Sequence, residues 1–213
     1  MKLYVKGGIA LSALLGLPIL LSGQASAAAC SISDINLTIA STTYNPSSCA
    51  EGISQTGGPT AETTNLNTAF GTSFTFVAKD DGTSDTLDGI KFAITADDGS
   101  TSGHWTVSWQ DTNGATSLNL PITIDFIVGL FGGDNGDGYE FQDVLLPTSP
   151  TSGTGSFEVV FLNNGGQVPG LSHVDLLAGD PEEVSTPVPE PATLALVGSA
   201  LVGFGFLRRR RKS

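Results

Sequence analysis

Apolar and polar residues alternate through much of residues 30–180. This period of two is typical of strands with one buried face, because successive side chains of a strand point to opposite faces. The segments that follow the pattern are 35–39, 73–77, 90–94, 105–109, 118–128, 139–146, 156–162 and 171–177. Asp-Gly, Asn-Gly and Gly-rich stretches between them suit hairpin turns. The sequence therefore predicts an all-β domain, an antiparallel β-sandwich or a jelly roll, and shows no comparably clear helix within it.

Charge is distributed very unevenly along the chain. Seven of the nine basic residues lie within the first six or the last six positions, whereas all 21 acidic residues lie between these ends. The central part therefore carries a net charge of about −19. Such a surface repels nucleic-acid phosphates and anionic lipid head groups, so we expect no nucleic-acid partner. It permits cationic partners without identifying one.

The beginning of the chain has the three parts of a secretory signal peptide. Lys2 and Lys6 precede an apolar stretch over residues 8–21, and Ala25-Ser26-Ala27 offers a cleavage site. We therefore expect residues 1–29 to form a signal helix that the Sec translocon and signal peptidase recognise. A retained membrane anchor is one alternative. A lipoprotein modified at Cys30 is another, although the large aliphatic residue expected three positions earlier is missing.

The last part of the chain also reads as a targeting segment. After a linker at residues 181–187, the segment 188–213 contains Pro189-Glu190-Pro191 and then residues 192–207, which carry no charge. As a helix this stretch would be about 24 Å long, short of the roughly 30 Å hydrocarbon core of a membrane. Snorkelling basic side chains could cover part of the difference. The basic residues that follow, expected to stay cytoplasmic, are Arg208, Arg209, Arg210, Arg211 and Lys212.

The order of these three features resembles the PEP-CTERM sorting signal of Gram-negative bacteria. The resemblance covers about residues 187–213 and implies recognition at Pro189, Glu190 and Pro191 by exosortase, a membrane transpeptidase-like enzyme. It implies a precursor held transiently in the inner membrane with a periplasmic domain, and a mature form on the cell surface or outside the cell. Residues 153–157 and 171–174 also resemble the end of many PEP-CTERM ectodomains, which implies a β-rich ectodomain. The alternative is an ordinary tail anchor with an incidental Pro-Glu-Pro.

Cys30 and Cys49 are the two cysteines of the chain. Export would place them in an oxidising compartment, where we expect them to form a structural disulfide.

The sequence contains no recognisable catalytic motif, and we predict no catalytic residues and no enzymatic activity. His104 and His173 are the only histidines, they lack zinc-type spacing, and no Gly-x-Ser-x-Gly elbow occurs. Ser172 beside His173 does not indicate a catalytic pair, since neighbouring strand residues point to opposite faces. The carboxylates considered for glycoside hydrolysis, among which no spacing selects a pair, are Glu140, Asp143 and Glu158.

Two sets of residues are candidates for binding. Asp134, Asn135 and Asp137 could form a calcium loop, although they miss the EF-hand register, and an acidic hairpin turn is the alternative. Trp105 and Trp109 lie on one strand face, where they would stack on carbohydrate if exposed and belong to the core if buried. The sequence thus indicates no cofactor other than a possible calcium ion.

Together these features favour an exported, exosortase-processed surface or extracellular-matrix protein without enzymatic activity, associated with exopolysaccharide or a biofilm. A carbohydrate- or calcium-binding module and a secreted hydrolase are the alternatives.

Overall fold

The computed structural model describes residues 28–112 and 120–184. The predicted signal helix (residues 1–27 of it), Pro189-Glu190-Pro191, the predicted transmembrane helix 192–207 and the basic residues 208–212 lie outside the described residues. Within the described ranges, no helix is long and apolar enough to cross a membrane.

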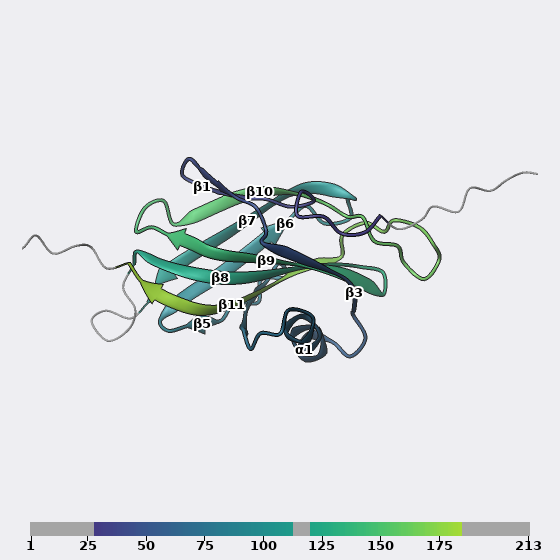
Figure 1. Ribbon diagram of the computed structural model, residues 1–213, viewed down its shortest axis with the longest axis horizontal. Helices are drawn as coiled ribbons and strands as arrows, with labels where there is room; N and C mark the ends of the chain where they lie inside the picture. Colours follow the sequence, from purple (N-terminus) through teal and green to yellow (C-terminus); the bar gives the residue numbers. More distant parts are fainter. Residues whose placement is uncertain (1–27, 113–119, 185–213) are drawn as a thin grey trace, which may run out of the picture.

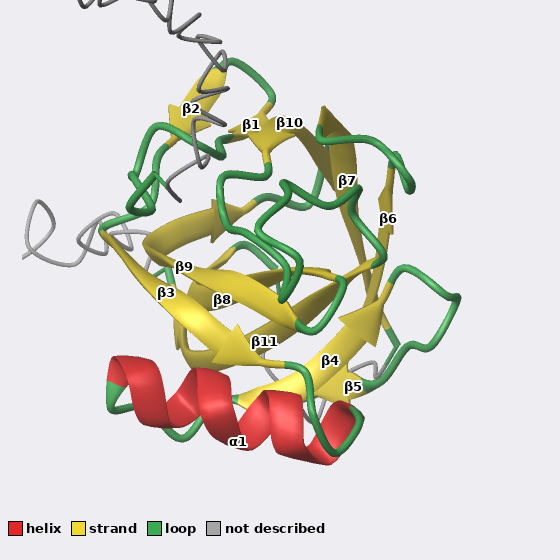
Figure 2. Ribbon diagram, turned by 90° about the vertical axis from the view of Figure 1, so that its right-hand side faces the viewer, coloured by secondary structure: helices red, strands yellow, loops and turns green. Residues whose placement is uncertain are grey.

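The described residues form two antiparallel sheets and one helix, arranged as three layers in Figure 1 and Figure 2. The six-stranded sheet contains, in spatial order, β2 (Thr42–Tyr44), β1 (Leu37–Ile39), β10 (Ser152–Glu158), β7 (Ser102–Asp111), β6 (Ile90–Ala96) and β5 (Thr86–Leu87). The five-stranded sheet contains β3 (Ser48–Ser54), β9 (Asn135–Leu146), β8 (Ile122–Gly132), β11 (His173–Glu183) and β4 (Thr75–Lys79). The helix is α1 (Pro59–Phe70).

This arrangement confirms the prediction of an antiparallel all-β domain. Each of the eight predicted segments overlaps a strand, whereas β2, β3, β5 and α1 were not predicted. β10 begins four residues earlier than expected, at Ser152, and β11 continues to Glu183, into the predicted linker. With sheets of six and five strands, the sandwich is larger than an eight-stranded jelly roll.

The two sheets differ in how many of their faces are covered. In the six-stranded sheet, strand β6 alternates between buried and exposed residues, which is typical of a sheet with one face in water. In the five-stranded sheet, the second half of β8 is buried continuously, from Phe126 to Gly132. The reason is that the large core lies on one face of this sheet and α1 lies on the other (Figure 2).

Trp105 and Trp109 belong to the core between the sheets, as expected if they are buried, and do not form a carbohydrate-stacking platform. They are 1% and 2% exposed. The Trp105 indole N–H donates to the Asn36 carbonyl (2.9 Å), and the Trp109 indole N–H donates to the Pro147 carbonyl (3.1 Å). The alternation of β7 turns both rings inward, and the backbone carbonyls satisfy their polar atoms, as buried indoles require.

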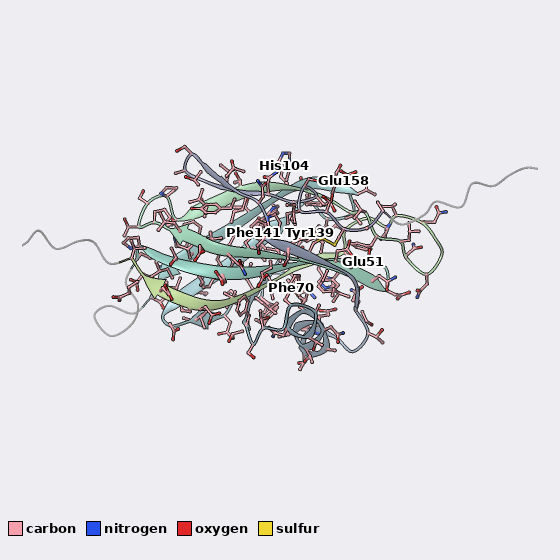
Figure 3. The ribbon with its side chains drawn as sticks, viewed as in Figure 1. Glu51, Phe70, His104, Tyr139, Phe141 and Glu158 are labelled. Atoms are coloured by element: carbon pink, nitrogen blue, oxygen red, sulfur yellow. A yellow bond between two sulfur atoms is a disulfide. The ribbon has the colours of Figure 1, made fainter. Side chains whose placement is uncertain are left out.

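Helix α1 packs on a glycine pair of the five-stranded sheet. Gly129 of β8 and Gly138 of β9 are register partners. A Cβ atom on Gly138 would lie 2.7 Å from the Phe70 ring and 2.8 Å from the Leu66 side chain, both on α1. Phe70 accordingly lies between the helix and the sheet in Figure 3. The two glycines therefore allow the close approach of the helix.

A disulfide joins Cys30 to Cys49, with 6.2 Å between their Cα atoms, as predicted. It closes a loop that contains β1 and β2 of the six-stranded sheet and ends on β3 of the five-stranded sheet. Because the Cys30 sulfur is bonded to Cys49, this residue is not available for lipid attachment in this structure.

Replacing both Cys30 and Cys49 by serine should lower the free energy of unfolding by about 3 kcal/mol, because a cross-link across 19 residues is lost from the unfolded chain. Denaturant unfolding of the purified protein measures the change. The parent protein in reducing agent is the control, and its free energy of unfolding should equal that of the double serine variant. An unchanged unfolding midpoint, with two thiols titrating in the native protein, would contradict this account of the bond.

Candidate functional site

Three ionisable side chains are buried together beneath α1: Glu62, His173 and Asp175, which we call the buried polar cluster. Their exposed fractions are 2%, 7% and 0%. Lys, Glu, Asp and His rarely lose nearly all contact with water unless they are paired or bind an ion. The cluster is therefore the chemically most unusual place in the described part of the chain.

The local structure explains why these residues meet. Glu62, Leu66 and Phe70 follow one another at intervals of four residues, so they share the face of α1 that lies on the sheet. His173 and Asp175 are two residues apart in β11 and share the sheet face that α1 covers. Glu62 thus occupies a helix position that would ordinarily hold an apolar residue, and it points at two polar positions of the strand.

The nitrogen and oxygen atoms of the cluster that could serve as metal ligands face one another at short range. One such atom from each of the three residues lies within 4.8 Å of the other two, and His173 Nε2 is 3.5 Å from Glu62 Oε2. Within the described part of the chain, Glu62 Oε2, His173 Nε2 and both Asp175 carboxylate oxygens have no hydrogen-bond partner. Lys79 Nζ is 3.9 Å from Asp175 Oδ1, which allows attraction between the charges but is too long for a hydrogen bond.

The orientation of the His173 ring follows from its neighbours. The ring stacks on Phe131, with 4.9 Å between the ring centroids, and its Nδ1 atom is 3.2 Å from the Ser172 hydroxyl. That hydroxyl donates its single proton to the Phe131 carbonyl at 2.9 Å. A hydrogen on Nδ1 can therefore be donated to the Ser172 oxygen, which leaves an unprotonated Nε2 facing Glu62. The Gln55 side-chain amide lies 3.4 Å from the same Nδ1, and it suits this tautomer when its oxygen rather than its nitrogen faces the ring.

The environment disfavours charge on the cluster. Burial raises the pKa of Asp175 to about 8; the Lys79 charge opposes this rise and the Glu62 carboxylate adds to it. Burial, together with the Lys79 charge, lowers the pKa of His173 below its ordinary value. This shift favours the uncharged imidazole, the form in which histidine binds metal ions.

A pocket of about 490 Å³ leads from the surface to the cluster. Glu62 and His173 form part of its wall, and Gln55, Pro59 and Asp134 are among the other lining residues. The cluster can therefore exchange a proton, an ion or a water molecule with solvent.

The residues of the possible calcium loop form an acidic hairpin turn, the alternative that the sequence left open, and the three side chains do not line one pocket. Asp134 lies in the turn between β8 and β9, where its carboxylate accepts a hydrogen bond from the Asn164 side chain (2.7 Å) and lines the pocket beneath α1. Asn135 and Asp137 line a different pocket, and the Asn135 amide donates to the Leu162 carbonyl. These residues form a hairpin turn and the start of β9, where alternation sends neighbours to opposite sides.

Asp137 is itself a buried carboxylate, 1% exposed, at the edge where β3 pairs with β9. Its Oδ1 accepts a hydrogen bond from the Gly52 N–H at 3.2 Å. Burial raises its pKa to about 6; the Gly52 hydrogen bond opposes the rise, and the negative charges of Glu51 and Asp34 add to it.

The other residues considered for catalysis are dispersed. Glu140 and Asp143 lie on β9 of one sheet, and Glu158 lies on β10 of the other. His104 lies on the outer side of the six-stranded sheet (Figure 3), with a side chain that is 84% exposed. Ser172 does contact His173, because it precedes β11 and does not follow the strand alternation.

Sequence reasoning missed Glu62 and Asp175. Glu62 belongs to a helix that was not predicted, although Pro59 at its start and Gly71 at its end, with a φ of 69°, are helix start and stop signals. Asp175 was one acidic residue among many, and its only distinction was its place two residues after His173.

Replacing Asp137 by asparagine should stabilise the protein at pH 7–8 by about 1–3 kcal/mol, because the native state no longer buries a charge. The pKa of Asp137 is higher in the folded than in the unfolded protein, so its stabilising protonated form is lost as the pH rises through about 6. The advantage of the variant should therefore shrink from pH 7 to pH 4 in denaturant unfolding. Glu182→Gln, at an exposed position, is the control; equal stability of Asp137→Asn and the parent protein at pH 7 would refute this role.

Comparison with known proteins identifies the segment that follows β11. Residues 187–211 match the family model of the PEP-CTERM protein-sorting motif. No curated protein and no solved structure matches the chain. The motif implies an exported, membrane-anchored precursor that exosortase processes for the cell surface. The family match thus shows that the chain carries a PEP-CTERM protein-sorting motif at residues 187–211.

Proposed function

We propose that this protein is a non-enzymatic component of the cell surface or extracellular matrix, which exosortase releases from, or transfers out of, the inner membrane. The observation that carries the proposal is the sorting motif at residues 187–211, only a few residues after β11 ends at Glu183. The short connection would hold the folded domain close to the membrane until the tail is cut.

The charge of the folded domain and its disulfide support a location outside the membrane. Its basic residues, histidines aside, are Lys79 and Lys91, against many carboxylates on both sheets, so anionic lipid head groups repel it. Once the tail is removed, nothing in this charge distribution favours a return to the lipid surface. The Cys30–Cys49 disulfide suits an oxidising exterior.

A passive role in the matrix agrees with the arrangement of the chemical groups. Of the carboxylates proposed for hydrolysis, Glu140 and Asp143 lie on β9 and Glu158 lies on the other sheet, and the two tryptophans are in the core. Exopolysaccharide is the partner class that this role implies, with biofilm as the setting. A calcium- or carbohydrate-binding module and a secreted hydrolase are the alternatives that remain to be tested.

Replacing Pro189, Glu190 and Pro191 by alanine should trap the full-length protein in the inner membrane of its host. The reason is that the two prolines keep the motif extended, in a form that a peptidase can bind, and the variant loses this restriction. Immunoblots of inner-membrane, outer-membrane and medium fractions measure the distribution. The matched control replaces Val184, Ser185 and Thr186, which lie before the motif in the predicted linker, by alanine, and should be processed normally. Unchanged processing of the Pro-Glu-Pro variant would refute exosortase recognition at this motif.

A further inference from the structure

We propose that Glu62, His173 and Asp175 bind one divalent transition-metal ion, of the class of Zn²⁺ or Mn²⁺, between α1 and β11. This site is independent of the sorting motif and adds a ligand to the folded domain.

The first argument is that the cluster presents electron-pair donors with no hydrogen atom between them. Glu62 Oε2 and His173 Nε2 face each other, both buried and both without a hydrogen-bond partner in the described residues. In the tautomer with its hydrogen on Nδ1, where the Ser172 oxygen can accept it, the imidazole offers the lone pair of Nε2 to the cluster. Facing lone pairs in a buried place repel each other unless a cation lies between them.

The second argument is distance. In a tetrahedral site with metal–ligand bonds of about 2.0–2.1 Å, neighbouring ligand atoms lie about 3.3 Å apart. The separation of His173 Nε2 and Glu62 Oε2 is 3.5 Å, which suits two ligands of one ion and is longer than a good hydrogen bond. One carboxylate oxygen of Asp175 completes the set of three ligand atoms, which all lie within 4.8 Å of one another, so a slight inward movement of side chains would bring them to bonding distance of one ion.

The third argument is charge. When both carboxyl groups are ionised, as metal binding requires, two carboxylates and one neutral imidazole are buried together. Lys79 Nζ lies 3.9 Å from Asp175 Oδ1. One lysine at that distance leaves the Glu62 carboxylate and the unpaired second oxygen of Asp175 without compensation. A divalent cation would satisfy all of these atoms at once. A proton shared between the carboxylates is the competing solution.

The fourth argument concerns support of the ligands and the kind of ion. A metal-bound histidine ordinarily donates its other N–H to an oxygen, as His173 does to Ser172. The side-chain amide of Gln55 lies 3.4 Å from the same Nδ1 and its own oxygen is unpaired, so turning this amide by 180° would provide a second acceptor. One nitrogen and several carboxylate oxygens suit Zn²⁺ or Mn²⁺ better than Ca²⁺, which prefers oxygen ligands alone. The pocket beside Glu62 and His173 has room for water as a further ligand.

The test uses the exported full chain, without a histidine tag, purified from membranes in detergent and freed of metal by a chelator. We expect it to bind one Co²⁺ per chain with a visible absorption band, and Zn²⁺ to displace the Co²⁺. His173→Gln should weaken Zn²⁺ binding more than about 100-fold, since even loss of an outer partner costs 10–100-fold. His104→Gln, which changes the exposed histidine, is the matched control and should bind like the parent protein.

Binding of Co²⁺ and Zn²⁺ by the parent protein can be measured whether or not a variant folds. Asp175→Asn, which keeps the volume of the side chain, provides a second variant. Zn²⁺ should raise the melting temperature of the parent protein and of His104→Gln, and leave that of Asp175→Asn unchanged. Absence of Co²⁺ and Zn²⁺ binding at micromolar concentration would overturn the proposal in favour of the shared proton. Equal loss of binding in His173→Gln and His104→Gln would overturn it as well. Neither result depends on whether the tail is processed.

Discussion

Burial of both faces of the five-stranded sheet is the constraint on which the rest of the structure depends. One face covers the large core against the six-stranded sheet, and α1 covers the other. Strand β8 must consequently be buried on both sides near its end, and Gly129 and Gly138 must lack side chains for the helix to approach. Within residues 28–112 and 120–184, no helix covers the six-stranded sheet, and its outer face carries polar residues and the exposed His104.

The same constraint creates the buried polar cluster. The sheet-facing side of α1 contributes Leu66 and Phe70, but its first turn contributes Glu62. Covering β11 with that turn removes His173 and Asp175 from water. A carboxylate in this position costs free energy unless something compensates it, which links the packing of the helix to the metal ion that we propose.

The sequence was informative where periodicity is strong. Alternation located eight of the strands, and export chemistry predicted the Cys30–Cys49 bond. Helix α1 was missed because its Thr- and Asn-rich sequence has few large apolar residues, so tertiary packing rather than amphipathicity stabilises it. The cluster was out of reach because Glu62 and His173 are distant in the chain and meet only through that helix. Trp105 shows a further limit, since alternation places a residue on a face without telling whether water or another sheet covers it.

The sorting motif and the folded domain answer different questions. The motif accounts for the export of the protein. The folded domain that is exported is an acidic, disulfide-linked β-sandwich with the buried polar cluster beneath its helix.

The most direct test of the account is the intact mass of the protein recovered from outside the inner membrane of its own host. We predict a chain that lacks both the signal peptide and the segment after about Pro189, with Cys30 and Cys49 oxidised. A chain that retains Arg208–Lys212 and is found only in the inner membrane would contradict it.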